Sequence, residues 1–198
     1  MDIDLKRIFD VVVSFTGIIL LLPILTIISG LISIFDGFPI LFIHKRVGLN
    51  FKGINIYKFR TMKKIKDSNK RFDLGSRERI TNLGSFLRRL KLDELPQLYN
   101  VLRGDLSLVG PRPEVEGWID PKSKDWQKIL SIKPGITDLA SIEFSNEEYI
   151  LDQSSDPRKT YKENILPKKI AISIKYVEKN SILSDIVIII RTLIKIIF

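Results

Sequence analysis

The chain of 198 residues contains no cysteine. This absence excludes disulfide bonds, thiolate catalysis and cysteine-ligated zinc sites together. Histidine occurs only once, as His44, so a Ser-His-Asp machinery is excluded unless His44 serves as its base. Because His44 lies between an apolar run and the cations Lys45 and Arg46, the sequence favours a structural role for it at an interface.

Alanine is almost as rare, with Ala140 and Ala171 as its two occurrences. No Ala-x-Ala processing site can therefore follow the apolar N-terminal run, and a cleaved signal peptide is not expected. Basic residues outnumber acidic ones by 32 to 23, which gives a formal net charge of +9. This excess predicts an anionic partner: nucleic acid, anionic lipid or a phosphorylated substrate. The length fits one domain with a sizeable core.

Residues 11–35 form an unbroken stretch of 25 residues without a charged side chain. The stretch is long enough to cross the hydrocarbon core of a bilayer. It is apolar on every face, which argues against a buried helix of a soluble domain. Pro23 near its centre is expected to kink the helix. Hydroxyl groups that could satisfy the freed backbone flank the proline on both sides: Ser14, Thr16, Thr26, Ser29 and Ser33.

The charges that flank this stretch leave two topologies open. Lys6 and Arg7 precede it, and Lys45 and Arg46 follow it, so the positive-inside rule favours the cytoplasm for both ends. A helix that breaks at Pro23 and re-enters the same leaflet satisfies both ends. A straight single-pass anchor with a tolerated proline satisfies only one of them.

The middle of the chain has shorter patterns. Apolar residues alternate through residues 54–59 between glycine turns, which predicts short strands. Arg46, Lys58 and Arg60 lie among aromatic residues there and could reach a phosphate, although solvated surface charge is the plainer interpretation of each one alone. Residues 63–79 are polar and highly charged, and they predict a mobile loop.

Two adjacent carboxylates, Asp93 and Glu94, follow a helix that is predicted to begin at residues 81–82. Asp93 is a good N-cap for the next helix, with Pro96 in its first turn and Gly104 at its end. This capping role is the structural interpretation of Asp93. The catalytic alternative is that one carboxylate attacks phosphorus while its neighbour holds a divalent cation.

Arg112 lies in a rigid Gly-Pro-Arg-Pro turn at residues 110–113. The prolines restrict its backbone, so its guanidinium costs little entropy to position and suits a bidentate grip on phosphate. More cations gather near the acidic pair: Arg77, Arg79, Arg88, Arg89, Lys91 and Arg103. Those near a helix C-terminus also have a structural explanation in the helix dipole. Carboxylates among cations are what chemistry on a phosphorylated substrate requires.

Four segments of the chain carry a resemblance to a known family. They are KRVG (45–48), YKFRTM (57–62), LDELPQLYNVLRGDLSLVGPRP (92–113) and KPGIT (133–137). Together with the KRIFD opening (6–10), they make the chain similar, nearly end to end, to the bacterial sugar transferase family, which comprises the monotopic polyprenyl-phosphate phosphoglycosyl transferases.

The resemblance implies that a UDP-sugar donates its sugar 1-phosphate to undecaprenyl phosphate with release of UMP, at the cytoplasmic face of the bacterial inner membrane. It implies that Asp93 carries the phosphosugar covalently and that Glu94, beside Asp93, holds Mg²⁺. Arg88 and Arg112 would then grip phosphate, with Pro111 beside the nucleotide. These implied contacts add to those that the residue pattern allows for Lys58 and Arg60.

The resemblance also implies a re-entrant membrane helix that breaks at a proline, which favours re-entry over the single-pass anchor. The break in the family is often Ser-Pro, whereas this chain has Leu22-Pro23. The hydroxyl that satisfies the broken ladder is therefore expected from Ser14 or Thr26. Many family members also have glycine at the position of Asp138.

The C-terminal third begins with a predicted turn at residues 133–135, followed by an extended segment at 136–144. Short helices are predicted within residues 145–169, with breaks at Asp156-Pro157 and Leu166-Pro167. Residues 181–198 predict an amphipathic helix that lies in the membrane plane, with burial against the domain core as the alternative. Its polar arc consists of Ser181, Ser184, Asp185, Arg191, Thr192 and Lys195, with Ile188 as the one apolar member.

The whole sequence therefore predicts an α-rich α+β protein in three parts. These are a re-entrant, proline-broken membrane helix (1–36), a compact cytosolic catalytic domain with short strands (37–180) and an amphipathic membrane-associated helix (181–198). The expected partners are a UDP-sugar, undecaprenyl phosphate and the phospholipid membrane, and a homo-oligomer is left open. The alternative function is a membrane-tethered basic module that binds anionic lipid or nucleic acid. Nucleic acid is disfavoured because no array of stacking aromatic residues and no helix-turn-helix or zinc pattern is present.

Overall fold

The computed structural model of the chain describes residues 3–63 and 79–197. Its helices are α1 (Ile3–Phe35), α2 (Asn82–Arg89), α3 (Gln97–Arg103), α4 (Lys124–Ile129), α5 (Leu139–Glu143), α6 (Glu147–Asp152), α7 (Pro157–Thr160), α8 (Leu166–Lys179) and α9 (Ile182–Ile197). Single turns of 3₁₀ helix are η1 (Leu49–Phe51), η3 (Leu92–Glu94) and η4 (Glu116–Trp118), and η5 (Tyr161–Ile165) is a π-helix. The helix-rich chain with short strands agrees with the predicted class. The loop predicted at residues 63–79 lies almost wholly outside the described residues.

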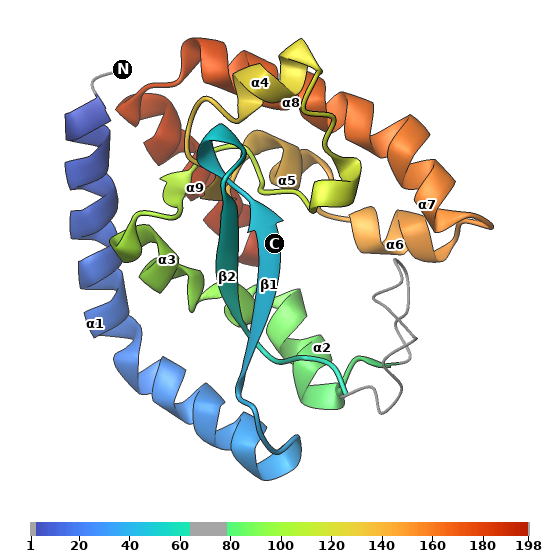
Figure 1. The fold of residues 1–198 in the computed structure, drawn as a ribbon. Helices are drawn as coiled ribbons and strands as arrows, with labels where there is room; N and C mark the ends of the chain where they lie inside the picture. Colours follow the sequence, from blue (N-terminus) through green and yellow to red (C-terminus); the bar gives the residue numbers. More distant parts are fainter. Residues whose placement is uncertain (1–2, 64–78, 198) are drawn as a thin grey trace.

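Two small sheets position the centre of the molecule. Strands β1 (Leu41–Val47) and β2 (Gly53–Phe59) form the antiparallel ribbon that the alternation predicted, with Leu41 opposite Phe59. Strands β3 (Ser107–Val109) and β4 (Gly135–Thr137) pair in parallel and bring the Gly-Pro-Arg-Pro turn beside the Lys-Pro-Gly turn. The ribbon crosses in front of the helices, with α1 along one side and α8 across the top (Figure 1).

The buried apolar residues form three clusters. One joins the turn end of the ribbon to α4, η5 and α8 through Val47, Trp126 and Leu166. A second joins β2, α3 and β3 to α9. The third packs Ile28 and Ile32 of α1 against Phe59 and Leu87. Because the third cluster includes residues near the end of α1, the long apolar helix is part of the domain core as well as a candidate membrane segment.

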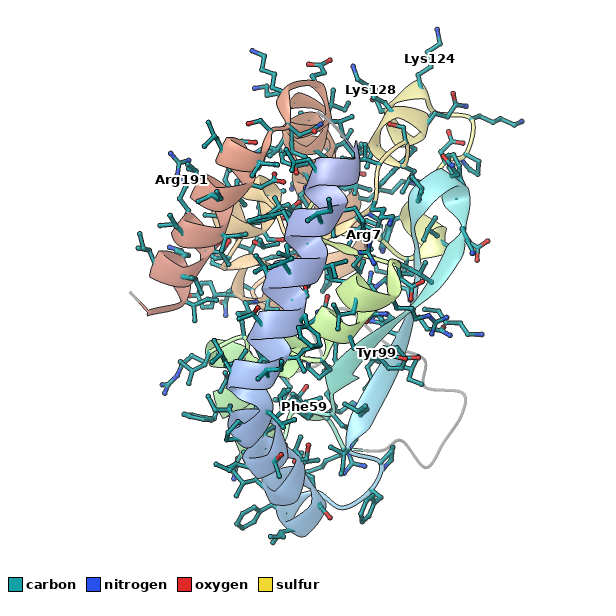
Figure 2. The ribbon with its side chains drawn as sticks, turned by 90° about the vertical axis from the view of Figure 1, so that its left-hand side faces the viewer. Arg7, Phe59, Tyr99, Lys124, Lys128 and Arg191 are labelled. Carbon is teal, nitrogen blue, oxygen red and sulfur yellow. The ribbon has the colours of Figure 1, made fainter. Side chains whose placement is uncertain are left out.

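Both ends of α1 are fastened to the same domain. At its start, the guanidinium of Arg7 donates to the carbonyls of Val101 (2.6 Å) and Leu102 (2.8 Å) in α3 (Figure 2). At its end, the guanidinium of Arg60 donates to the carbonyls of Asp36 and Gly37. Arg60 therefore satisfies carbonyl groups at a helix C-terminus, which is a structural role.

Helix α1 runs through Pro23 without interruption, and its axis changes direction partway along (Figure 1). The helix is thus bent and not broken into two, as proline in a helix interior predicts. The hydroxyl of Thr26 donates to the carbonyl of Leu22 at 2.9 Å. The Ser14 hydroxyl is buried and has no hydrogen-bond partner in the described chain. Pro23 lacks the N–H that would donate to the carbonyl of Ile19, and the Thr26 hydroxyl bonds to Leu22 instead. The prediction that Ser14 or Thr26 satisfies the broken ladder is therefore wrong. By length and composition, α1 is the one helix among the described residues that could cross a membrane.

Helix α9 has one face that packs against the domain and another that is exposed. Asp185 in its polar arc is fully buried and pairs with Lys6 of α1 and with the hydroxyl of Tyr176 at 2.6 Å. Thr192 contacts Thr137 through a hydroxyl pair at 2.6 Å. The opposite face is apolar and exposed: Leu183, Ile186, Val187, Ile190, Leu193 and Ile194. Asp185 and Thr192 thus contact the domain, whereas Arg191 and Lys195 are exposed together with these apolar residues.

One prediction for the C-terminal third is wrong and two concern helix boundaries. Residues 139–143 form α5 instead of an extended segment, because Asp138 accepts a hydrogen bond from the backbone of Ser141 and caps the helix. At Leu166-Pro167 the helix type changes but the backbone stays helical, because Pro167 lies in the first turn of α8, where proline is tolerated. The π-helix η5 joins α7 to α8. The helix start at Asp156-Pro157 is confirmed, with Asp156 as the cap of α7.

The parallel β3–β4 pair provides a test of how the Arg112 turn is held. A methyl group at Gly135 would overlap the backbone of Gly110, so Gly135→Ala is expected to force the two turns apart. We expect it to lower the free energy of unfolding by about 1–3 kcal/mol. Thermal unfolding in detergent measures the effect. Gly117→Ala is the matched control because its methyl group would meet nothing within 4 Å, and an equal effect of both changes would contradict this account.

Candidate active site

The acidic pair lies in a tight connection between two helices. Helix α2 is capped by Thr81, as predicted, and ends near Lys91, whose backbone is left-handed (φ 54°). The chain then forms η3, which contains Asp93 and Glu94. The residue that caps α3 is Pro96, so the prediction that Asp93 caps this helix is wrong. Gly104 ends α3 in the left-handed conformation, as predicted (φ 92°).

Glu94 is the centre of an ion cluster. Its Oε1 accepts a hydrogen bond from Nζ of Lys58 at 2.6 Å and from Nη2 of Arg112 at 3.0 Å. The Glu94 side chain is 11% exposed, so both interactions act in a largely desolvated place. The structure thus brings together three residues that the sequence predicted for the site, from segments 36 and 18 positions away from Glu94.

Lys58 and Arg112 are each positioned by separate hydrogen bonds to their backbone segments. Asn100 in α3 accepts from the backbone of Tyr57 (3.0 Å) and donates to the carbonyl of Asn55 (2.7 Å), which keeps β2 and therefore Lys58 against α3. The backbone of Arg112 donates to the carboxylate of Asp138 at 3.2 Å. The carbonyl of Pro111 accepts from the backbone of Gly135 at 3.1 Å. The position of Arg112 is therefore set by these contacts as well as by its neighbouring prolines.

The two carboxylates have opposite electrostatic environments. Burial acts to raise the pKa of Glu94, but Arg112 and Lys58 outweigh it and hold this pKa well below its usual range. Burial, followed by the charge of Glu94, raises the pKa of Asp93. The Oδ1 atom of Asp93 is buried and has no hydrogen-bond partner among the described residues. One acid is thus a fixed anion, while the other is a desolvated and more basic carboxylate.

Further cations line the same region on β1. Arg46 lies 3.7 Å from the carboxylate of Glu114, which also accepts from the hydroxyl of Tyr161 at 2.6 Å. The pKa of His44 is lowered to about 3 by burial and by the charges of Arg46, Lys58 and Arg112. His44 is therefore neutral at physiological pH. Its structural role stays a prediction.

Arg88 lies at the edge of this cluster. Its Nε donates to the Thr61 hydroxyl at 2.9 Å, and its Nη1 pairs with the exposed Glu148 at 3.1 Å. The charge of Arg88 is among those that act to lower the pKa of Asp93. Arg88 is thus placed where it acts on Asp93, and its partner Glu148 is 66% exposed, so it can exchange that partner for an anionic ligand.

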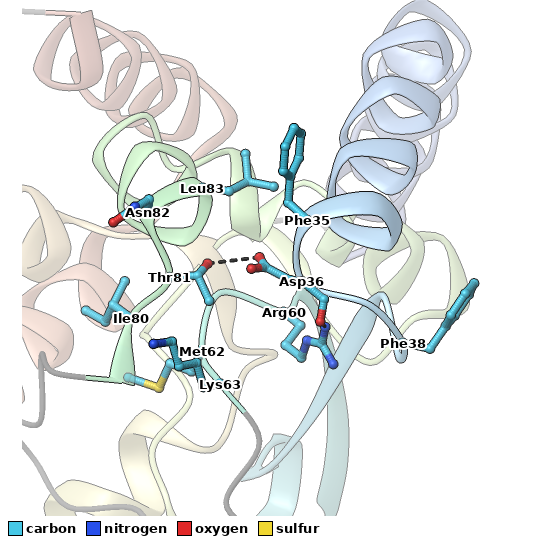
Figure 3. Close-up of a pocket in the computed structure, with 10 residues that line it drawn as sticks. All are labelled: Phe35, Asp36, Phe38, Arg60, Met62, Lys63, Ile80, Thr81, Asn82 and Leu83. Carbon is cyan, nitrogen blue, oxygen red and sulfur yellow. Dashed lines mark hydrogen bonds between the residues drawn. The ribbon is translucent and has the colours of Figure 1, made fainter.

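Arg60 lies apart from the ion cluster and beside a cavity of about 710 Å³ at the C-terminal end of α1 (Figure 3). Phe35, Phe38 and Leu83 line the same cavity, and the Thr81 hydroxyl donates to Asp36 at its wall at 2.9 Å. Neither Asp93 nor Glu94 lines this space. The predicted phosphate contact of Arg60 is not supported by its position, because its guanidinium is occupied at the end of α1.

A metal ion would have few protein ligands here. No group of three or more acids or histidines that could hold a metal occurs within residues 3–63 and 79–197. Both ion pairs of Glu94 already use its Oε1. The unpartnered Oδ1 of Asp93 does fit a cation that binds mainly through substrate phosphates, as Mg²⁺ commonly does.

Comparison with known proteins decides the family. The model of the bacterial sugar transferases matches residues 1–198. The chain belongs to this family. It is 33% identical over 204 residues to the exopolysaccharide production protein ExoY of Sinorhizobium fredii, with 95% of this chain and 83% of the relative covered. It is 33% identical to the undecaprenyl-phosphate glucose phosphotransferase of Komagataeibacter xylinus, with 95% and 35% covered. It is 38% identical to the undecaprenyl-phosphate galactose phosphotransferase of Salmonella typhimurium, with 72% and 33% covered.

The relatives differ in length. The chain spans most of ExoY but only about a third of the length of the two named phosphotransferases. The residues of the ion cluster all lie within the part that matches the family model.

Sequence reasoning missed three residues of this family member's site. Asn100 and Gln97 are buried amides in α3, and Glu114 follows the Gly-Pro-Arg-Pro turn. Gln97 had a detectable signal, because it lies four residues after Asp93 and so on the same side of a helical chain. Asn100 and Glu114 act on strands that are distant in sequence, and no local pattern indicates such contacts.

The opposite pKa shifts of the acidic pair predict opposite effects on stability. Asp93→Asn is expected to raise the free energy of unfolding at pH 7 by about 0.5–2 kcal/mol, since it removes a buried and poorly solvated charge. Glu94→Gln is expected to lower it by about 3 kcal/mol, since it leaves two cations without their shared anion. Thermal unfolding at several pH values measures both effects.

The pH dependence separates the two carboxylates. The pKa of Asp93 is raised in the folded state, so its ionised carboxylate destabilises the fold at neutral pH. This destabilisation disappears as the pH falls from the raised pKa to the unfolded-state value of about 3.9. The pKa of Glu94 is lowered in the folded state, so its ionised carboxylate stabilises the fold at every pH above the unfolded-state value of about 4.3. This stabilisation is lost only as the pH falls below that value. A destabilised Asp93→Asn variant at pH 7 would contradict this assignment.

Proposed function

We propose that the protein is a membrane-bound phosphoglycosyl transferase that moves sugar 1-phosphate from a UDP-sugar to undecaprenyl phosphate. The observation that carries the proposal is the division of roles within the acidic pair: Glu94 is neutralised by two cations, while Asp93 is buried, raised in pKa and left with an unpartnered oxygen. The names of the relatives in Komagataeibacter xylinus and Salmonella typhimurium support the phosphotransferase class.

The reaction proceeds in two displacements at the same phosphorus. A carboxylate oxygen of Asp93 attacks the β-phosphorus of the donor, the bond to the bridging oxygen breaks, and UMP leaves with that oxygen and its electron pair. A phosphate oxygen of undecaprenyl phosphate then attacks the phosphosugar on Asp93. The bond to the carboxylate breaks, which restores Asp93 and leaves a polyprenyl diphosphate-sugar in the membrane. The raised pKa makes Asp93 a stronger nucleophile than an ordinary aspartate.

The surrounding cations bind the phosphates. Arg112 is 33% exposed and presents its guanidinium fork beside Glu94, and Arg88 approaches from α2. Lys58 remains with Glu94 and supplies fixed positive charge. Glu94 and Asp93 would hold Mg²⁺ together with the donor diphosphate, and the ion would offset phosphate charge. Pro111 lies next to Arg112 and would contact the nucleotide.

The membrane arrangement follows from the outward apolar faces of α1 and α9. Both ends of α1 contact the same domain, which supports insertion of α1 from one side of the bilayer as a re-entrant segment. Positive charges near both ends favour the cytoplasmic face of the inner membrane. In this arrangement we expect Asp93 to lie near the depth at which a lipid phosphate leaves the hydrocarbon.

The decisive activity test is Asp93→Asn. We expect release of UMP from a panel of UDP-sugars, with undecaprenyl phosphate in detergent, to fall by about 10³-fold or more. Membrane insertion and folding are expected to persist, because the change is isosteric. Glu116→Gln, at an exposed acid away from the ion cluster, is the control and should retain turnover. Turnover that survives in Asp93→Asn would remove Asp93 as the nucleophile, and a lipid- or nucleic-acid-binding module would be indifferent to this change.

Because the chain contains no cysteine, its membrane topology can be tested by labelling single introduced cysteines. A cysteine placed ahead of Met1 and a separate Lys122→Cys variant each provide a single labelling site. We expect a membrane-impermeant maleimide to label neither one in intact cells and both after the inner membrane is opened. If the N-terminal cysteine were labelled from outside while Lys122→Cys were protected, α1 would span the bilayer.

A further inference from the structure

Two buried polar atoms near the start of α3 have no hydrogen-bond partner among the residues that the structure describes: Oδ1 of Asp93 and Nε2 of Gln97. The two residues are 7% and 3% exposed. The nucleophile proposed above accounts for the first atom. Gln97 is not used in that mechanism, and its buried amide needs an explanation of its own.

The backbone directs Gln97 toward Asp93. Residues 95 and 96 have right-handed helical angles, so the chain is helical from Asp93 through Gln97. Residues four positions apart on a helical chain lie on the same face. Side chains in helices also lean toward the N-terminus, which carries the amide of Gln97 toward the turn that contains Asp93.

The energetic cost of this amide is not offset by the fold. A buried amide without an acceptor costs about 1–3 kcal/mol, and an apolar side chain of the same length would avoid that cost. Asn100, one turn further along α3, shows the contrast. Its side chain is fully buried and bonds to the backbone of both Tyr57 and Asn55. The amide of Asn100 therefore stabilises the fold through its hydrogen bonds, while the amide of Gln97 keeps an unpaired N–H donor.

We propose that Gln97 is a substrate-contacting residue, whose Nε2–H donates a hydrogen bond to a phosphoryl oxygen of the sugar phosphate as it is transferred to and from Asp93. The proposal rests on the function proposed above. A phosphoryl oxygen that gains charge during the displacement is a strong acceptor for a donor already held in a desolvated place. The donor costs no reorganisation because α3 fixes it in advance.

A neutral donor suits this position better than a cation. Lys58 and Arg112 hold Glu94 as an ion pair and lower its pKa. The same kind of pairing at Asp93 would lower its pKa and reduce its nucleophilicity. An amide can bind the phosphoryl oxygen without doing so, because it carries no charge. Gln97 thus completes the division of roles between the two acids.

The test is Gln97→Met, which keeps the length and burial of the side chain and removes the donor. We expect kcat/KM for UMP release to fall by about 10–100-fold through kcat, with KM for the UDP-sugar nearly unchanged. The unfolding midpoint is expected to stay equal or to rise, because an unpartnered donor has been removed from the interior. Gln97→Glu, which replaces the donor with an acceptor, is expected to lose at least as much activity.

Asn100→Leu is the matched control in the same helix. It is expected to lower the unfolding midpoint, since it leaves the backbone groups of Tyr57 and Asn55 unpaired. All rates are measured well below the unfolding midpoints, so that only folded protein is compared. The proposal is overturned if Gln97→Met keeps its kcat, or if its loss of kcat comes with a fall in midpoint like that of Asn100→Leu.

The failure of this inference can be told apart from failure of the proposed function. A wild-type protein that releases no UMP from any UDP-sugar, or an active Asp93→Asn variant, contradicts the transferase mechanism itself. Normal turnover of Gln97→Met beside an active wild type and an inactive Asp93→Asn contradicts only the role of Gln97.

Discussion

The two ion pairs of Glu94 are the interaction on which the rest of the site depends. Through Lys58 and Arg112 they join β2, the turn that carries the acidic pair and the Gly-Pro-Arg-Pro turn, which are distant in sequence. Each partner has a separate support, Asn100 for β2 and Asp138 for the Arg112 backbone. Because three elements converge on one carboxylate, the position of neighbouring Asp93 is determined by the whole domain.

The same convergence explains why Asp93 can remain unfavourable to the fold. A buried carboxylate with a raised pKa and an unpartnered oxygen costs stability, and Gln97 adds a second unpartnered atom nearby. The Glu94 cluster and the buried residues around β3 supply the stability that holds them. Strain and unsatisfied groups gather at functional sites for this reason.

Helices α1 and α9 are part of this construction. Lys6, Tyr176 and Asp185 connect the start of α1 to α8 and α9 inside the domain, so the two outward apolar faces have a defined position relative to the site. An amphipathic helix normally buries its apolar face in the protein. In α9 Asp185 and Thr192 contact the protein, while large apolar residues such as Leu183 and Leu193 are exposed, which is the arrangement expected of a helix beside lipid.

The sequence by itself determined the local elements and the chemistry available: the apolar run of α1, the β1–β2 ribbon, the Thr81 cap, the acidic pair and the rigid turn around Arg112. These depend on periodicity, on proline and glycine, and on neighbours a few residues apart. Only the tertiary structure decided that Asp93 is not a helix cap, that Arg60 holds the end of α1, that residues 139–143 are helical, and that Lys58 and Arg112 share one carboxylate. Such outcomes depend on contacts between segments far apart in the chain, whose energies no local pattern contains.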